Sequence, residues 1–267
     1  MDQDTFSFGK NWQRFLSCIN EERLATARAS LVEFLEKPNL ENLTFLDVGC
    51  GSGLFSNAAF HLKAKRIVSF DVDPFSVRCC EHLHAKVDKP SHWQIQQGSI
   101  LDPQLLSSLG QFDIVYSWGV LHHTGQMWDA IQNSAGLVKR GGFYYIAIYN
   151  TVDGILGSRF WLKIKKFYNR SPQFVQWLLV NIYCLALIVR CLLNFQNPLS
   201  FIRNYKSLRG MSFKTDAVDW VGGYPYEFAS IEEIFRFMKS NFPKFTLVNV
   251  KSTNNFGNNW FLFRNDA

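Results

Sequence analysis

The chain has 267 residues, of which 47% are hydrophobic and 19% charged, a balance that excludes an intrinsically disordered protein and allows a sizeable buried core. The formal net charge of +6 favours anionic partners such as phosphates, lipid head groups or nucleic acid, although a mildly basic surface is the simpler interpretation. The six cysteines include no C-x-x-C pair, so no metal site or disulfide framework is indicated. The acidic N-terminus lacks an apolar signal core, and we expect a cytoplasmic protein.

The first 40 residues are predicted to form an N-terminal helical segment. Apolar residues recur at helical spacing between Trp12 and Leu35, which indicates one or two helices. The aromatic residues of Phe6–Trp12 precede this pattern, and we expect them to pack on the edge of the domain that follows.

The segment 45–53 sets the pattern for the rest of the chain. An apolar run ends in Asp47, and three glycines follow at alternate positions. This pattern is typical of a buried parallel strand, Thr44–Val48, that enters a tight turn and then a helix near Leu54. Glycine permits backbone dihedrals that are closed to other residues, and the start of a helix offers free N–H groups to an electron-rich ligand. The alternative is a turn with a structural role only.

A second predicted strand, Arg66–Phe70, is followed by two acidic residues, Asp71 and Asp73. An acidic residue about 20 positions beyond a glycine turn is where nucleotide-binding folds place the carboxylate that binds ribose hydroxyls. An aspartate before a proline can instead cap a helix. Because Asp73 directly precedes Pro74, we assign the cap to Asp73 and the ribose contact to Asp71.

Strand and helix patterns continue to alternate up to residue 150, within a predicted core of residues 41–150. We expect helices at Phe75–Lys86 and Met127–Val138, the second stopped by Lys139–Gly142, and strands at Trp93–Gln97, Phe112–Ser117 and Phe143–Ile148. This alternation predicts right-handed crossovers and a parallel sheet that binds its ligand at the carboxyl ends of the strands.

The segment Thr44–Asn150 resembles class I S-adenosylmethionine-dependent methyltransferases. The resemblance lies in Leu46–Gly53, Phe70–Asp73, Phe112–Val115, Val120–His123 and Leu137–Gly142. Residues 8–12, 210–212, 219–227 and 257–259 are similar to a bacterial subgroup with no settled substrate. The resemblance implies a Rossmann-like α/β fold, with a seven-stranded sheet that ends in an antiparallel hairpin. Two positions depart from the family pattern: Ser99 replaces an acidic residue and Trp260 replaces a glutamate.

S-adenosylmethionine is the cofactor that the resemblance implies. Main-chain N–H groups of the glycine turn would bind its methionine carboxylate, Asp71 its ribose hydroxyls, and Val72 and Ile100 the two faces of its adenine. The expected cofactor-binding residues are Asp47, Gly49, Cys50, Gly51, Asp71, Val72, Ser99, Ile100, Ser117 and Trp118.

Two histidines, His122 and His123, follow the fourth predicted strand, beside the expected position of the methyl group. An imidazole has an unperturbed pKa suited to removing a proton from a methyl acceptor, so both are candidate catalytic bases. The alternative is that one of them points inward or caps the next helix.

Residues 151–229 form a predicted helical insertion that covers the acceptor site. Ser171 and Pro172 predict the start of a long apolar helix, Gln173–Phe195, with lysines and arginines on both flanks. The flanking cations are Lys163, Lys165, Lys166, Arg170, Arg203, Lys206 and Arg209. The sequence favours a lid or dimer helix over an interfacial membrane helix, and the interfacial helix over a membrane span.

The insertion ends in residues 219–227, where aromatic side chains, carboxylates and paired glycines predict a loop that binds the acceptor. Its candidate substrate residues are Tyr149, Asp219, Tyr224, Tyr226 and Glu227. The alternative is that the tyrosines only brace the insertion against the sheet. In residues 230–267, Ser230–Glu233 predicts a capping box that opens a helix, and Lys244–Lys251 and Trp260–Arg264 predict a hairpin.

The leading hypothesis is therefore methyl transfer to a small-molecule or lipid-linked acceptor, with oxygen as the methylated atom. A nucleic-acid (RNA) methyltransferase is the second, although the Asn/Asp-Pro-Pro-aromatic signature of base amino-group methylation is absent after the fourth strand and a nucleic-acid partner is not favoured. A non-catalytic scaffold with the cofactor fold is the third. A homodimer and a peripheral membrane contact through residues 172–195 both remain open.

Overall fold

The computed structural model describes residue 6, residues 19–209 and residues 212–267. Part of the predicted N-terminal helix, the segment 8–12 and residues 210 and 211 lie outside these residues.

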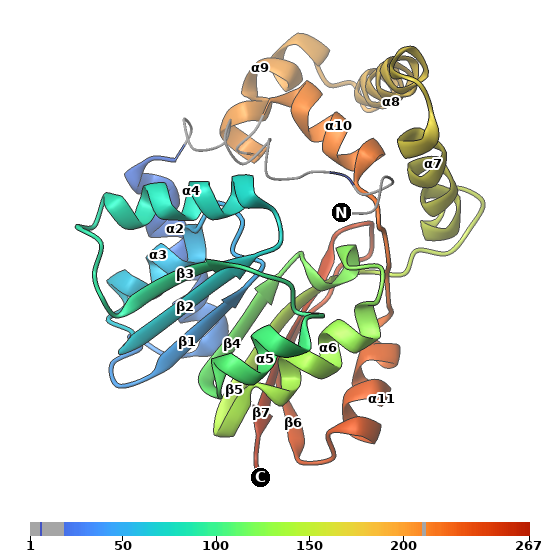
Figure 1. Ribbon diagram of the computed structural model, residues 1–267. Helices are drawn as coiled ribbons and strands as arrows, with labels where there is room; N and C mark the ends of the chain where they lie inside the picture. The colour runs from blue at the N-terminus through green and yellow to red at the C-terminus, as the bar shows by residue number, and fades with distance from the viewer. Residues whose placement is uncertain (1–5, 7–18, 210–211) are drawn as a thin grey trace.

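A seven-stranded sheet forms the body of the molecule (Figure 1), which confirms the predicted fold class. Its strand order is β3-β2-β1-β4-β5-β7-β6. The strands are β1 (Thr44–Val48), β2 (Arg66–Asp71), β3 (Trp93–Gln97), β4 (Phe112–Trp118), β5 (Val138–Tyr149), β6 (Phe245–Lys251) and β7 (Asn258–Asn265). The first five run parallel, and β7 pairs antiparallel with both β5 and β6 as the predicted hairpin.

Helices cover both faces of the sheet because neighbouring residues of a strand point to opposite sides. Leu46 of β1 packs with α5 (Pro103–Leu109), α6 (Met127–Gly136) and α11 (Ile231–Asn241). Its neighbour Phe45 packs with α2 (Glu21–Leu35), α3 (Leu54–His61) and α4 (Pro74–Ala85). Both strand residues are fully buried. The two apolar layers therefore hold the strand ends in fixed positions, which a ligand site requires.

The inserted segment folds as four helices above the carboxyl end of the sheet (Figure 1). They are α7 (Ser158–Arg170), α8 (Gln173–Leu193), α9 (Pro198–Arg209) and α10 (Phe213–Gly222). The insertion has a small apolar core of its own, in which Tyr168, Val180, Ala217 and Val221 are buried. We refer to these four helices as the cap.

Several element boundaries differ from the sequence prediction. Helix α6 ends at Gly136, and residues 139–142 are part of β5, where they bulge out of the pairing with β4. Val138 already pairs with Phe112, so the two glycines lie within the strand and do not stop a helix. Pro172, and not Ser171, is the N-cap of α8. The Ser171 hydroxyl donates to the Phe167 carbonyl and so closes the end of α7.

Other local predictions are confirmed. The Asp73 carboxylate caps α4 by accepting a hydrogen bond from the main-chain N–H of Phe75 at 2.8 Å. Ser230 and Glu233 form the predicted capping box of α11. Asp219 and Trp220, expected in a loop, lie in the last turn of α10, and the loop begins only after Gly222.

Candidate functional site

The glycine turn between β1 and α3 is built from left-handed backbone. Gly49, Gly51 and Gly53 have φ values of 72°, 53° and 79°, which L-residues with side chains rarely adopt. A Cβ on Gly49 would lie 2.3 Å from a methyl of Val120. The N–H groups of Gly49 and Cys50 both donate to the carbonyl of Phe70, at 2.9 and 3.0 Å. The turn is therefore held against the end of β2 and the exit of β4.

Asp71 lies at the end of β2 beside this turn. One carboxylate oxygen accepts from the N–H of Gly51 at 3.0 Å, and the other accepts from the N–H of Asp73 at 2.9 Å. Burial raises the pKa of this carboxyl to about 6, although both hydrogen bonds oppose the rise. A carboxylate has further lone pairs, so Asp71 keeps the capacity to accept from two ligand hydroxyls.

Asp47 lies beneath the turn and is 2% exposed. It accepts a hydrogen bond of 2.5 Å from the hydroxyl of Ser56 in α3. Burial raises the pKa of Asp47 to about 7, and the nearby Asp71 charge adds to the rise. In this structure the side chain joins β1 to α3, while the glycine turn above it presents main-chain atoms.

The residues expected around the adenine differ in exposure. Val72 is 53% exposed, while Ile100 is buried in the core layer of α5 and α6. The Ser99 hydroxyl accepts from the N–H of Leu101 at 3.1 Å. The Ser117 hydroxyl is buried and donates to the carbonyl of Val48 at 3.0 Å. Trp118 is partly exposed and meets Trp260 edge-on, with ring centres 6.0 Å apart.

His122 and His123 form the short 3-10 helix η1 (Leu121–His123) directly after β4. The Nδ1 of His122 accepts from the main-chain N–H of Tyr149 at 3.2 Å, so the proton of the neutral ring lies on Nε2. That Nε2 has no hydrogen-bond partner in the described part of the chain. Burial lowers the pKa of His122 well below its ordinary value, and the charges of His123 and Lys165 lower it further. His122 is thus a neutral hydrogen-bond donor.

His123 has the opposite arrangement. Its Nδ1 lies 2.5 Å from the carbonyl oxygen of Pro225, and a carbonyl can only accept, so Nδ1 carries the proton. Burial lowers the pKa of His123 to about 4, although the bond to Pro225 opposes the shift. Both rings contact Tyr149, with centres 4.0 Å and 5.4 Å away.

The segment 224–227 runs past η1 and connects it to α6. The N–H of Glu227 donates to the carbonyl of His122 at 2.9 Å. Both carboxylate oxygens of Glu227 accept from the N–H of Met127, at 3.2 and 3.1 Å, so this side chain caps α6. The main-chain oxygen of Tyr224 accepts from the N–H of Phe6 at 2.9 Å. Glu227 therefore has a structural bond in addition to its predicted contact with the acceptor.

An aromatic cluster joins the cap to the end of β5. Tyr149, Trp220 and Tyr226 lie with ring centres 5.3 to 6.2 Å apart. Tyr226 is 1% exposed, and its hydroxyl has no hydrogen-bond partner among the described residues. The structure thus brings together His122, His123, Tyr149 and Tyr226, while Tyr224 contributes through its main chain.

Sequence reasoning missed the burial of Lys165, which it counted only among the cations that flank the apolar helix. Lys165 is 1% exposed and points inward from α7. Its Nζ lies 4.3 Å from the ring centre of Trp220 and 4.8 Å from that of Tyr226. The sequence contained a signal for this inward orientation, because Trp161, Lys165 and Tyr168 recur at helical spacing and so share the apolar face of α7.

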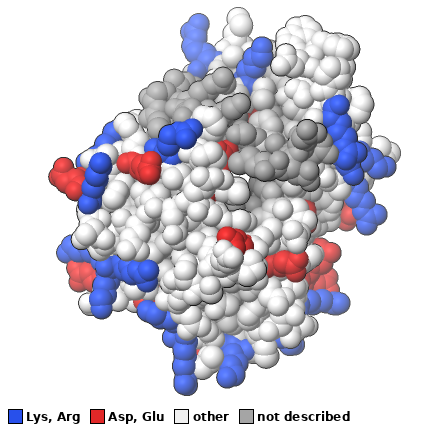
Figure 2. Space-filling model, viewed as in Figure 1, with Lys and Arg blue, Asp and Glu red and all other residues white. Residues whose placement is uncertain are grey.

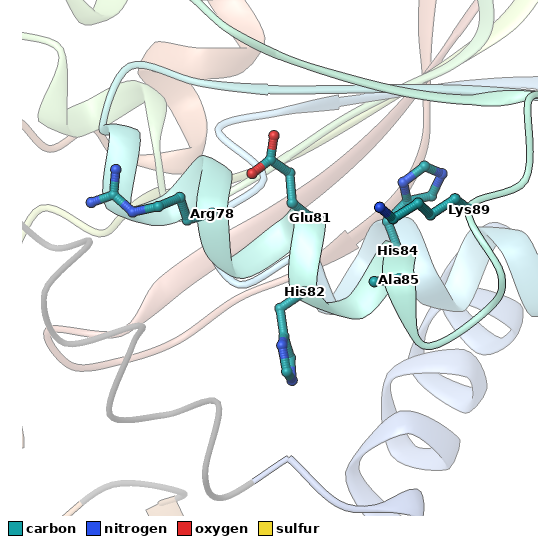
Figure 3. A pocket seen from close by; sticks show the side chains of 6 residues that line it. All are labelled: Arg78, Glu81, His82, His84, Ala85 and Lys89. Carbon is teal, nitrogen blue, oxygen red and sulfur yellow. The ribbon is translucent and has the colours of Figure 1, made fainter.

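A hollow elsewhere on the surface lies against α4 (Figure 3). It is lined by Arg78, Glu81, His82, His84, Ala85 and Lys89. In Figure 3 Glu81 and His82 point to opposite sides of the helix. Because these side chains do not converge, the hollow does not form a site.

Comparison with known proteins agrees with this geometry. Residues 46–144 match the methyltransferase domain family. Over 133 residues the chain is 29% identical to the ubiquinone biosynthesis O-methyltransferase of Pelagibacter ubique, an alignment that covers 48% of this chain and 52% of that protein. A ribosomal protein L11 methyltransferase of Thermotoga maritima is 42% identical over 95 residues, 34% of this chain and 32% of its own. The chain spans about half the length of the O-methyltransferases that it matches.

The fold extends beyond these alignments. A crystal structure of magnesium protoporphyrin IX methyltransferase from Synechocystis, with bound S-adenosylhomocysteine, superposes with a TM-score of 0.56. The superposition covers 97% of this chain and 94% of that protein, at 14% sequence identity. At this identity the match establishes the fold alone.

Proposed function

We propose that this protein, whose residues 46–144 match the methyltransferase domain family, transfers a methyl group from S-adenosylmethionine to an oxygen atom of a small-molecule or lipid-linked acceptor. The observation that carries the proposal is the Asp71 carboxylate, fixed beside a left-handed glycine turn where β1 and β2 end. Ligands of open α/β sheets bind at this edge, next to the point where the strand order reverses. Here that point lies between β1 and β4.

The residues at this edge fit the cofactor. The first turn of α3, whose N-cap Gly53 has no side-chain cap, offers main-chain N–H groups to a carboxylate. The N–H groups of Gly49, Cys50 and Gly51 already donate to Phe70 and Asp71, and so they hold the turn in place for the ligand. Asp71 would accept from the ribose hydroxyls, and the exposed Val72 would cover one face of the adenine. The bound cofactor supplies an electrophilic methyl group. The chain must align the acceptor atom with it and accept the acceptor's proton.

The two histidines have different roles in this proposal. The neutral ring of His122 carries its single N–H on the buried Nε2, so this side chain is a hydrogen-bond donor. His123 has a pKa of about 4, which makes it a weak base at neutral pH. Neither ring is therefore well suited to remove a proton from a hydroxyl. We retain both as residues that position the acceptor.

We also propose that helix α8 docks on an anionic lipid surface. Phe174, Leu178, Ile182, Leu185, Val189 and Leu192 form an exposed apolar stripe along one side of it. The helix has 21 residues, and its most apolar 18-residue stretch has a mean hydropathy of 1.9 and is only 11% buried. Exposed cations surround the stripe: Lys163, Lys166, Arg170, Arg190 and Arg203. In Figure 2 the corner over α8 is white, with blue side chains on both sides of it.

An apolar helix with basic neighbours fits the boundary between lipid head groups and acyl chains. Such docking favours a lipid-linked acceptor and a place at the cytoplasmic face of a membrane. If α8 instead associates with a second copy of the chain, dimer formation replaces lipid docking as the role of this helix.

The proposed function is tested by the fate of a labelled methyl group. The protein is incubated with S-adenosylmethionine labelled in its methyl group and a cell extract separated into lipid, small-molecule, RNA and protein fractions. We expect the label in the lipid or small-molecule fraction, and none there with Asp71→Ala. Label in RNA or protein would contradict the proposed acceptor class.

A further inference from the structure

Among the described residues, the buried Lys165 of the cap has no charged partner at hydrogen-bond distance. The Nζ of Lys165 donates to the main-chain oxygen of Trp220 and otherwise faces aromatic rings. Within the described residues no carboxylate forms a salt bridge with it. A buried ammonium is costly unless an anion compensates it. The fold therefore places a group that binds anions where no carboxylate of the described residues lies within salt-bridge distance.

Two further hydrogen-bond donors near Lys165 have no acceptor in the part of the chain that the structure describes. They are the Nε2–H of His122 and the hydroxyl of Tyr226, which are 0% and 1% exposed as residues. The Ser158 hydroxyl lies close enough to affect the pKa of Tyr226 but forms no hydrogen bond with it. Buried polar groups in folded proteins nearly always have partners. Tyr149 lies between the two residues, with ring centres 4.0 Å from His122 and 5.3 Å from Tyr226.

This group of donors lies on the cofactor side of the sheet. His122 follows the end of β4, and Tyr149 is the last residue of β5. Val120, two residues before His122, packs against Gly49 of the glycine turn. A ligand held by the donors would thus lie next to the cofactor edge, beneath the cap.

Few charges of the described residues face Lys165. Burial lowers its pKa to about 7, and the carboxylate of Asp219 opposes this shift. The neighbouring histidines have lowered pKa values and are neutral at pH 7. Because the pKa of Lys165 is lowered toward neutrality, both protonation states are accessible near pH 7. The ammonium can bind an oxyanion, and the neutral amine can accept a proton.

We propose that Lys165, His122 Nε2–H and the Tyr226 hydroxyl form the subsite for the reacting oxygen of the methyl acceptor, and that this acceptor is an oxygen acid such as a phenol, an enol or a carboxylic acid. The inference rests on the proposed methyltransferase function and specifies its acceptor. An oxygen acid fits because its anion satisfies three donors at once, whereas an alcohol oxygen at ordinary pH remains protonated and carries its own donor.

At this subsite the acceptor oxygen would lose its proton before it is methylated. The neutral amine of Lys165 takes the proton of the acceptor O–H, so that an N–H bond forms and the O–H bond breaks. The oxygen would then use a lone pair to bond to the methyl carbon, and the sulfonium sulfur would leave as a neutral thioether that keeps the electron pair of the broken carbon–sulfur bond. The ammonium of Lys165 later returns its proton to water. An acceptor that binds as an anion skips the first step, and Lys165 then stabilises its charge.

The subsite is tested with p-nitrophenol, whose phenolate absorbs visible light and whose phenol does not. Protein saturated with S-adenosylhomocysteine is titrated with the probe, and its absorbance is followed against pH. We expect bound p-nitrophenol to ionise at lower pH than in water. Lys165→Met should abolish this shift and weaken phenolate binding by roughly tenfold to hundredfold, the effect of one lost charge-assisted hydrogen bond. Lys214→Met, which changes an exposed lysine of the same cap on α10, is the matched control and should behave as wild type.

Further measurements test whether the shift depends on the Tyr226 hydroxyl and on the negative charge of the ligand. Tyr226→Phe should reduce the shift while it leaves the protein folded, because only a hydroxyl is removed. Benzoate should compete with p-nitrophenol, whereas p-nitroanisole, which cannot ionise, should bind equally weakly to wild type and Lys165→Met. An unshifted ionisation in wild type, or an equal shift in Lys165→Met, would overturn the subsite.

The two proposals fail in different ways. Wild-type protein that binds S-adenosylhomocysteine without affecting p-nitrophenol would remove the subsite and leave the methyltransferase function intact. Wild-type protein that binds no S-adenosylhomocysteine would contradict the proposed function itself.

Discussion

At the scale of the residue, Gly49 combines a left-handed backbone with a close neighbour. Its φ of 72° and its approach to Val120 both disfavour a side chain. Gly141 has a similar φ of 74°, but a Cβ on it would meet no atom within 4 Å. Both Gly→Ala variants should lose about 1–2 kcal/mol from backbone strain. Gly49→Ala should lose roughly 1–3 kcal/mol more from overpacking.

Urea denaturation directly measures the difference in the free energy of unfolding between Gly49→Ala and Gly141→Ala. Calorimetry with S-adenosylhomocysteine should show that Gly141→Ala binds normally and that Gly49→Ala binds weakly. Equal stability and equal binding in the two variants would mean that the turn tolerates a side chain beside Val120.

Asp47 should make stability depend on pH. Its folded pKa of about 7 lies above the ordinary 3.8, so between these values the folded protein binds more protons than the unfolded chain does. The contribution of this group to stability is therefore present below about pH 4 and is lost as the pH rises toward 7. Asp47→Asn removes the titration and keeps an oxygen that can accept from Ser56.

We expect the unfolding free energy of Asp47→Asn, relative to wild type, to increase between about pH 4 and pH 7, by a few kcal/mol at most, since one pKa unit corresponds to about 1.4 kcal/mol. Urea titrations at several pH values provide the measurement. A constant difference across this range would show that the folded carboxyl titrates normally.

Some roles of single residues could be predicted from the sequence and others could not. The position of Asp73 before Pro74 is a local signal for a helix cap, and the structure confirms that assignment. The proton position on His122 depends on the N–H of Tyr149, 27 residues away. The burial of Lys165 depends on Trp220 and Tyr226, which approach only when the cap has folded. Such long-range contacts leave no local pattern.

At the scale of the element, α8 carries a separable prediction. If its apolar stripe docks on lipid, Leu178→Ser with Leu185→Ser should reduce sedimentation with anionic vesicles, and so should Lys163→Glu with Arg170→Glu. High salt should reduce binding as well, because charge contributes to it. Phe235→Ser, which removes an exposed apolar side chain of α11, should have no effect.

Vesicle sedimentation should be accompanied by analytical ultracentrifugation without lipid. Suppose that wild type does not sediment with vesicles and is a dimer by analytical ultracentrifugation, while the Leu178 and Leu185 double variant is a monomer. That result would mean that the apolar stripe of α8 packs against a second copy of the chain and not against lipid.

Element boundaries were the weaker part of the sequence prediction. The pair Gly141–Gly142 is typical of a helix stop, yet the pairing of Val138 with Phe112 places it in a bulge of β5. The paired glycines after Asp219 and Trp220 indicate a loop, but α10 continues to Gly222. In both cases tertiary packing decided where the element ended.

At the scale of the whole molecule, the topology was predictable because each strand of the core carries its own signal. Alternating strands and helices imply parallel pairing and right-handed crossovers, and the five core strands are indeed parallel. The position of the cap over the strand ends followed from where the insertion leaves β5. Its internal packing, with Tyr168 and Val180 in a separate small core, was not encoded in any single segment.

The central claim is that the β1–β2 edge binds S-adenosylmethionine through Asp71. Isothermal titration calorimetry with S-adenosylhomocysteine, on wild type, Asp71→Ala and Asp71→Asn, tests it most directly. We expect saturable binding by wild type and a loss of roughly tenfold to hundredfold in affinity for Asp71→Ala, because hydrogen bonds to a charged group each contribute about 1.5–3 kcal/mol. Asp71→Asn should fall between them. Equal affinity in all three proteins, with wild-type melting temperatures, would contradict the claim.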